Sequence, residues 1–106
     1  MTTRGAVSLP SRSLGGRKVI CFARLAKGIR KTEKTTHNLT GGDPADFKGL
    51  VIVEERAGAA YYLFYCNEQW EVLTDTWHRT LDDAKSQAEF EFEGVAQAWE
   101  SLPVDA

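Results

Sequence analysis

Short stretches in which apolar and polar residues alternate, separated by turn residues, fill the middle of the chain. Alternation with a period of two is typical of β-strands that have one face in a core. It predicts four strands, over residues 17–25, 50–55, 61–66 and 69–74. Gly58 and the pair Asn67-Glu68 separate the last three, which are therefore expected to form an antiparallel meander. The strand 17–25 is apolar on both faces for most of its length, which predicts an interior position in the sheet.

The pattern changes to helical spacing after Arg79. Thr80 is a favourable N-cap, and Asp82 and Asp83 put negative charge at the positive end of the helix dipole. Gly94 is expected to end the first helical piece or to bend it. One apolar stripe is predicted, made of Leu81, Ala84, Ala88, Phe92, Val95 and Trp99. The expected fold class is α+β, with a four-stranded, mainly antiparallel sheet and a helix over 80–102 packed on one face.

The remaining segments have compositions that do not favour regular structure. Residues 1–16 are rich in Ser, Gly and Arg, which predicts a flexible leader before a single domain over 17–102. The polar, threonine-rich residues 27–40 are expected to form a mobile loop, and residues 103–106 a tail. One or two helical turns are predicted over Pro44–Lys48, with Phe47 buried.

The amino-acid composition excludes some classes of protein but does not indicate an activity. The chain has 106 residues, of which 42% are hydrophobic, so that one small core is expected. No apolar run approaches the roughly 18 residues that a membrane span needs, and the start lacks the apolar stretch of a secretory signal. We therefore expect a cytoplasmic protein with no membrane contact, in which both cysteines are buried, reduced thiols. Neither a cofactor nor a metal is expected, because Cys21, Cys66, His37 and His78 lack the closely spaced ligand pairs of structural zinc sites.

Charge is divided unevenly along the chain. Residues 1–34 contain nine basic side chains and one acidic side chain, which makes this part +8 and leaves −10 for the rest of a chain with net charge −2. Such asymmetry is one indication of a nucleic-acid partner. One alternative function is therefore nucleic-acid binding by the basic segment 17–34, through Arg24, Lys27, Arg30 and Lys31. The other interpretation is that the basic segment complements the protein's own acidic helix.

The residues between the last predicted strand and the helix form the richest group of functional side chains. A loop over 75–79 would present Trp77, His78 and Arg79 to a partner, because loops on a rigid scaffold often carry binding sites. A small enzyme is a second alternative, with Asp75 and His78 as an acid–base pair or Cys66 and His78 as a thiol–imidazole pair.

Phe90 lies within an alternating acidic run and gives a second candidate for a contact surface. On a regular helix it would point away from the core stripe, surrounded by Glu89, Glu91 and Glu93. The alternative is that Phe90 covers a second layer of the protein's own chain. The stretch from Trp70 to Phe92 resembles segments of small bacterial proteins, and this resemblance assigns no catalytic residues to the chain. The leading hypothesis is a non-catalytic protein-interaction module that binds another protein or a second copy of itself.

Overall fold

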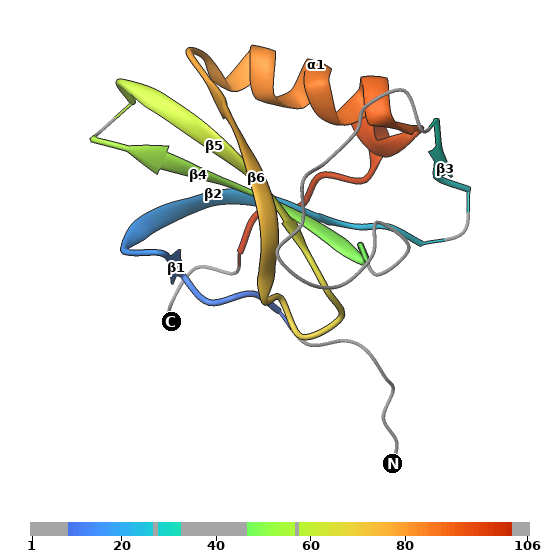
Figure 1. The fold of residues 1–106 in the computed structure, drawn as a ribbon, viewed down its shortest axis with the longest axis horizontal. Helices are drawn as coiled ribbons and strands as arrows, with labels where there is room; N and C mark the ends of the chain where they lie inside the picture. The colour runs from blue at the N-terminus through green and yellow to red at the C-terminus, as the bar shows by residue number, and fades with distance from the viewer. Residues whose placement is uncertain (1–8, 27, 33–46, 57, 103–106) are drawn as a thin grey trace.

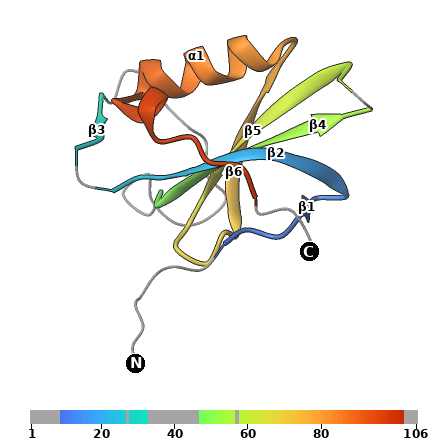
Figure 2. The same ribbon diagram turned by 180° about the vertical axis from the view of Figure 1, so that it is seen from behind.

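The computed structural model describes residues 9–26, 28–32, 47–56 and 58–102. It has an α+β architecture with one α-helix, α1 (Leu81–Glu91), which lies along one side of a curled antiparallel sheet (Figures 1 and 2). The five strands of that sheet are β1 (Ser13–Leu14), β2 (Arg17–Arg24), β4 (Gly49–Glu55), β5 (Ala60–Cys66) and β6 (Val72–His78). A second, two-stranded sheet pairs β3 (Arg30–Lys31) with β7 (Phe92–Glu93), and a short 3₁₀ helix, η2, spans Val95–Gln97.

The larger sheet is a meander with the order β1-β2-β4-β5-β6. This order confirms the antiparallel meander, and it confirms that the strand predicted over 17–25, now β2, lies inside the sheet. The prediction of four strands was wrong by one, because Ser13 and Leu14 pair with the start of β2. Gly15 and Gly16 make this possible, since their φ angles of 59° and 77° allow a tight turn that other residues rarely adopt. The expected leader over 1–16 therefore contains a strand, while residues 1–8 lie outside the described part.

A separate apolar cluster lies on each face of the sheet. The cluster on the side of α1 contains Cys21, Ala23, Phe47, Leu50, Ile52, Leu63, Tyr65, Ala84, Ala88, Phe92 and Val95. The cluster on the opposite face contains Val19, Phe22, Val51, Val53, Phe64, Cys66 and Trp70. Phe47 is buried as predicted, while residues 44–46 of the predicted helical turn lie outside the described residues. Both cysteines are buried, free thiols.

The α-helix is shorter than predicted. It begins after Thr80, whose side chain accepts a hydrogen bond from the Asp83 N–H, and it ends at Glu91 instead of continuing to residue 102. Gly94 was expected to end or bend the helix, but α1 has already ended with Phe92 as its C-cap, and Gly94, with a φ of 101°, instead precedes η2 as its N-cap. Beyond η2 the chain returns to the sheet, where Glu100 and Phe22 exchange two backbone hydrogen bonds of 2.7 and 2.9 Å. The last third of the predicted helix therefore consists of η2 and a segment that pairs with β2 at Phe22.

The last strand of the sheet begins later than predicted and ends later. The Asn67 side chain accepts hydrogen bonds from the Gln69 and Glu71 N–H groups, both at 2.9 Å, and so extends the turn. Trp70 takes a φ of 65° within that turn, which a non-glycine residue rarely adopts. Pairing with β5 then runs from Val72 to His78, with one register shift between Tyr65 and Cys66. The prediction of a strand over 69–74 followed by a loop over 75–79 was wrong for this reason.

The segment expected to be a mobile loop, 27–40, contains the strand β3. Arg30 and Lys31 pair with Glu93 and Phe92 of β7, and the Thr32 N–H donates to the Glu91 carbonyl at 2.8 Å. Both views place β3 beside the C-terminal end of α1 (Figures 1 and 2). Lys27 and residues 33–40 lie outside the described part.

Candidate functional site

The candidate binding residues around Trp77 belong to the edge strand β6. The register with β5 sets Asp75 opposite Phe64 and Trp77 opposite Tyr62, on the face turned away from α1. His78 lies opposite Tyr61, whose side chain packs with the cluster under α1. Successive residues of a strand point to opposite faces. The structure therefore turns the Trp77 and His78 side chains to opposite faces of β6, and Arg79 follows the end of the strand.

Trp77 is the most exposed large apolar side chain of the described residues, with 52% of its surface accessible. Val72, at the other end of β6, is 42% exposed and lies opposite Cys66, again on the face turned away from α1. Asp75 lies between them and is also exposed. We call these three residues the β6 surface.

The catalytic pairs considered from the sequence are not brought together. Asp75 and His78 project from opposite faces of β6, and Cys66 lies in the cluster opposite the face of His78. Burial also raises the pKa of the Cys66 thiol to about 12 and that of the Cys21 thiol to about 11. A thiolate at either position is therefore disfavoured near neutral pH.

A zinc site made from the two cysteines is not supported by their positions. Cys21 belongs to the cluster under α1 and Cys66 to the cluster on the other face of the sheet. His37 lies outside the described part of the chain. Within residues 9–26, 28–32, 47–56 and 58–102, no group of three His, Cys, Asp or Glu side chains is arranged to hold a metal ion.

His78 lies next to a buried polar network under α1. Its Nε2 is 2.7 Å from the Thr76 Oγ1. Deeper in the core, the Tyr65 hydroxyl and the Gln87 side-chain amide both donate to Oε2 of Glu91, the amide at 2.7 Å. Glu91 is only 5% exposed, so this carboxylate is held inside the protein by its hydrogen bonds. Partial burial lowers the pKa of His78, against the opposing effect of the Asp83 and Glu91 charges.

The lowered pKa of His78 predicts a pH dependence of stability. The folded state binds a proton at His78 less readily than the unfolded chain, whose histidine titrates near 6.5. Protonation therefore favours unfolding, and this part of the stability is lost as pH falls below that value and through the folded-state pKa. We expect His78→Gln to lose less stability than the wild type between pH 8 and pH 5, measured by urea unfolding at several pH values. A constant difference between the two proteins across this range would contradict the assignment.

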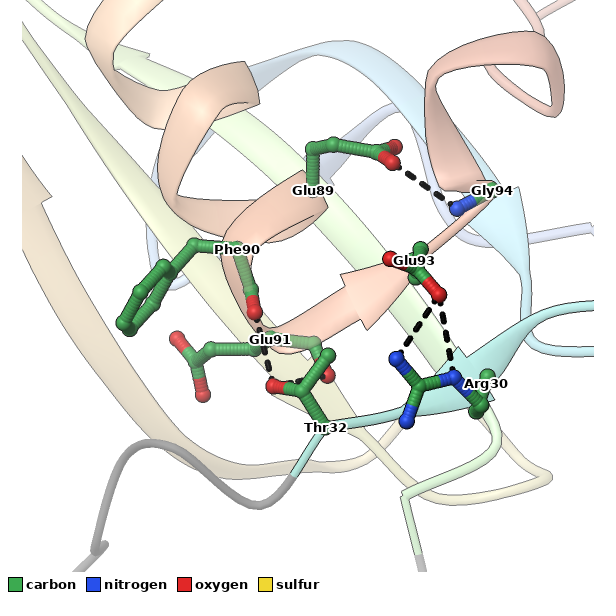
Figure 3. A network of polar contacts seen from close by, with 7 residues as sticks. All are labelled: Arg30, Thr32, Glu89, Phe90, Glu91, Glu93 and Gly94. Carbon is green, nitrogen blue, oxygen red and sulfur yellow. Dashed lines mark hydrogen bonds and ion pairs between the residues drawn. The ribbon is translucent and has the colours of Figure 1, made fainter.

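Sequence reasoning placed Glu89 and Glu91 beside Phe90 on an exposed surface, but both carboxylates have structural contacts, of which Figure 3 shows that of Glu89 with Gly94. Glu89 accepts hydrogen bonds from the Gly94 and Ala96 N–H groups, both at 2.9 Å, which lowers the pKa of its side chain. Glu91 is buried and accepts a hydrogen bond from the Tyr65 hydroxyl. The burial of Glu91 corrects the expectation that this carboxylate lies on the surface beside Phe90. The helical spacing could have predicted the burial of Glu91, because Ala84, Ala88 and Glu91 recur at helical intervals on the buried face.

Phe90 itself is 48% exposed. Figure 3 shows its ring pointing away from the ion pair of Arg30 and Glu93, while its backbone carbonyl accepts a hydrogen bond from the Thr32 hydroxyl at 2.7 Å. Phe90 and the β6 surface therefore present apolar side chains from two different elements.

The basic residues proposed for nucleic-acid binding are largely engaged within the protein. The Arg24 Nη1 donates to Oε2 of Glu100 at 2.7 Å, and its guanidinium lies 5.3 Å from the centre of the Phe22 ring. Arg30 donates to Oε1 of Glu93 through Nε and Nη2, at 2.9 and 2.8 Å. Lys31 belongs to β3, and Lys27 lies outside the described part. These two ion pairs support the interpretation that basic side chains complement acidic ones within the fold.

A shallow depression lies where β6 meets α1, lined by Trp77, His78, Arg79, Asp83, Ser86 and Gln87. It is open to solvent and has no described cluster of catalytic or metal-ligating groups. No described helix is long and apolar enough to cross a membrane. Comparison of the chain with protein-family models, with curated proteins and with solved structures finds no match.

Proposed function

We propose that this protein is a non-catalytic protein-interaction module that binds its partner through the β6 surface. The observation that carries the proposal is Trp77, which is 52% exposed on the last strand of the sheet. Tryptophan is strongly enriched among the residues that dominate binding energy, because it buries a large area with little loss of conformational freedom. An indole that stays in contact with water contributes little to the stability of the folded chain, whereas its burial by a partner would contribute to binding.

The backbone of β6 adds a second reason. β6 pairs with β5 on one side, and no described strand pairs with its other edge. Edge strands expose N–H and C=O groups that another chain can pair with, and many recognition domains bind extended peptides in this way. Trp77 and Val72 would then contact side chains of the added segment on the face turned away from α1.

The two alternatives, a small enzyme and a nucleic-acid-binding protein, have weaker support. The candidate catalytic residues Asp75, His78 and Cys66 lie on different faces of the sheet, and the depression beside β6 has no nucleophile paired with a base among the described residues. Arg24 and Arg30 are paired with glutamates, which leaves less basic surface for phosphates.

The test compares Trp77→Ser and Phe90→Ser with the wild type and with Leu9→Ser as a control. Leu9 is 44% exposed but lies outside β6 and α1. Because all three side chains are exposed, we expect each variant to unfold within about 0.5 kcal/mol of the wild type. The tagged full chain is then used to recover partners from the source organism's lysate after nuclease treatment, with quantification by mass spectrometry. Sedimentation over a concentration series detects binding to a second copy.

We expect a stoichiometric protein partner, or a self-association, that Trp77→Ser loses and Leu9→Ser keeps. Phe90→Ser reports whether the α1 side contributes to the same interface. Binding that survives Trp77→Ser, or that disappears with nuclease, would contradict the proposal. A loss of several kcal/mol in Trp77→Ser or in Phe90→Ser would show instead that the side chain belongs to the core.

A further inference from the structure

The β6 surface combines an aromatic ring with a carboxylate. Asp75 and Trp77 are two residues apart on one strand and point to the same face, so their Cα atoms are separated by about 6.5 to 7 Å. Within the described part of the chain, the Asp75 carboxylate has no ion pair or hydrogen bond, and the Trp77 indole has no ring contact or hydrogen bond. Both groups are exposed to solvent.

The protein already places a cation on an aromatic ring of this face. Tyr62 lies opposite Trp77 in the register, and the Arg17 guanidinium carbon lies 4.6 Å from the centre of the Tyr62 ring. The neighbouring indole is a better cation-binding ring than a phenol, and it has no such cation among the described residues. A nearby carboxylate adds direct charge attraction to the ring's attraction for a cation.

On these grounds we infer that the β6 surface recognises a lysine or arginine side chain of an extended segment that adds to β6 as a further strand. The cation of that segment lies between the Trp77 ring and the Asp75 carboxylate, and an apolar residue of the segment contacts Val72. The charge of Asp75 is what selects a basic partner over a neutral one. Arg79, two residues beyond Trp77, repels a second cation at the far end and so limits the basic position to the side of Asp75.

This inference rests on the proposed function, so the experiment separates the two. A phage library of random dodecapeptides is selected on the immobilised full-length wild type, and in parallel on Trp77→Ser, Asp75→Lys and Asp82→Asn. Asp82 is an exposed carboxylate in the first turn of α1, and its replacement removes the same charge from a residue outside the β6 surface. Peptides enriched on the wild type are then measured by fluorescence anisotropy.

We expect the wild type and Asp82→Asn to enrich peptides with a Lys or Arg flanked by apolar residues at alternate positions. Asp75→Lys should instead enrich Asp or Glu at that position. The dissociation constant of the best wild-type peptide should rise about 3- to 10-fold with Asp75→Asn, as expected for an exposed ion pair next to an aromatic ring. It should also rise with salt concentration.

The outcomes distinguish the two proposals. Peptides that depend on Trp77 but are neutral or acidic, or that bind Asp75→Asn as tightly as the wild type, would overturn the recognition of a cation and leave the β6 surface as the binding site. Selection in which no enriched peptide depends on Trp77 would overturn both proposals.

Discussion

Tyr65→Phe is expected to lower the free energy of unfolding by about 2–3 kcal/mol, although it removes a single oxygen atom. Tyr65 is fully buried, and its hydroxyl donates a hydrogen bond to the carboxylate of Glu91, which is 5% exposed. Burial, and then the hydrogen bond to Glu91, raise the pKa of Tyr65 far above its ordinary value, so that the hydroxyl keeps its proton and acts as donor. Without this donor, a buried carboxylate loses a partner that water cannot replace.

The ring of the variant should stay where it is. Phe47 and Phe92 pack against Tyr65 with ring centres 5.3 and 6.1 Å away, and phenylalanine keeps those contacts. The expected loss therefore reports the hydroxyl alone. Tyr61→Phe is the matched control, because Tyr61 lies on the same strand and its hydroxyl has no described hydrogen bond. We expect that change to cost less than about 0.5 kcal/mol.

A double-mutant cycle tests the cause. Glu91→Leu removes the carboxylate, and in that background Tyr65→Phe leaves no buried charge without its donor. Replacing both partners of a buried polar pair by apolar groups is often close to neutral, whereas removing one is not. Urea unfolding should therefore give a coupling energy of at least about 1 kcal/mol between the two changes. Additive effects, or a neutral Tyr65→Phe, would show that the hydrogen bond does not hold Glu91 in place.

Local patterns in the sequence predicted the central strands well because those patterns report burial directly. β2, β4 and β5 alternate or are apolar throughout, and they lie where the periodicity indicated. The capped start of α1 at Thr80 and the turn at Gly94 also follow from residue types with strong backbone preferences. These elements are determined by interactions close in the chain.

The two strands that the sequence analysis missed or misplaced, β1 and β6, depend on contacts that the alternation of apolar and polar residues does not indicate. β1 forms only because the Gly15–Gly16 turn folds Ser13 and Leu14 back onto β2. β6 begins at Val72 because the Asn67 side chain and the positive φ of Trp70 extend the preceding turn. That shift decides the candidate site, since it converts an expected loop into a strand and turns the Trp77 and His78 side chains to opposite faces. Once the strand is known, the period of two assigns the faces from Thr74 to His78, and the register shift between Tyr65 and Cys66 puts Val72 on the same face as Asp75 and Trp77.

Gly49→Ala is expected to destabilise the protein by about 3 kcal/mol, the upper end of the usual cost of overpacking a core. Gly49 begins β4 in the middle of the sheet, between Arg24 of β2 and Cys66 of β5. A methyl group at this position would lie 2.3 Å from Cζ3 of the Trp70 ring. That ring cannot move freely, since it is 8% exposed and packs edge-on against Phe22 with ring centres 5.6 Å apart.

The Trp70→Leu background shows whether the ring is responsible. With the indole removed, the added methyl group has space, and Ala in place of Gly lowers the conformational entropy of the unfolded chain. We therefore expect Gly49→Ala to be neutral or slightly stabilising in Trp70→Leu, with both backgrounds measured by urea unfolding under circular dichroism. An equal cost in the two backgrounds would place the requirement for glycine in the backbone of β4. A loss of stability confined to the wild-type background would show that the Trp70 ring requires glycine at position 49. The contact of this ring with Gly49 would then hold the turn before β6 against the sheet.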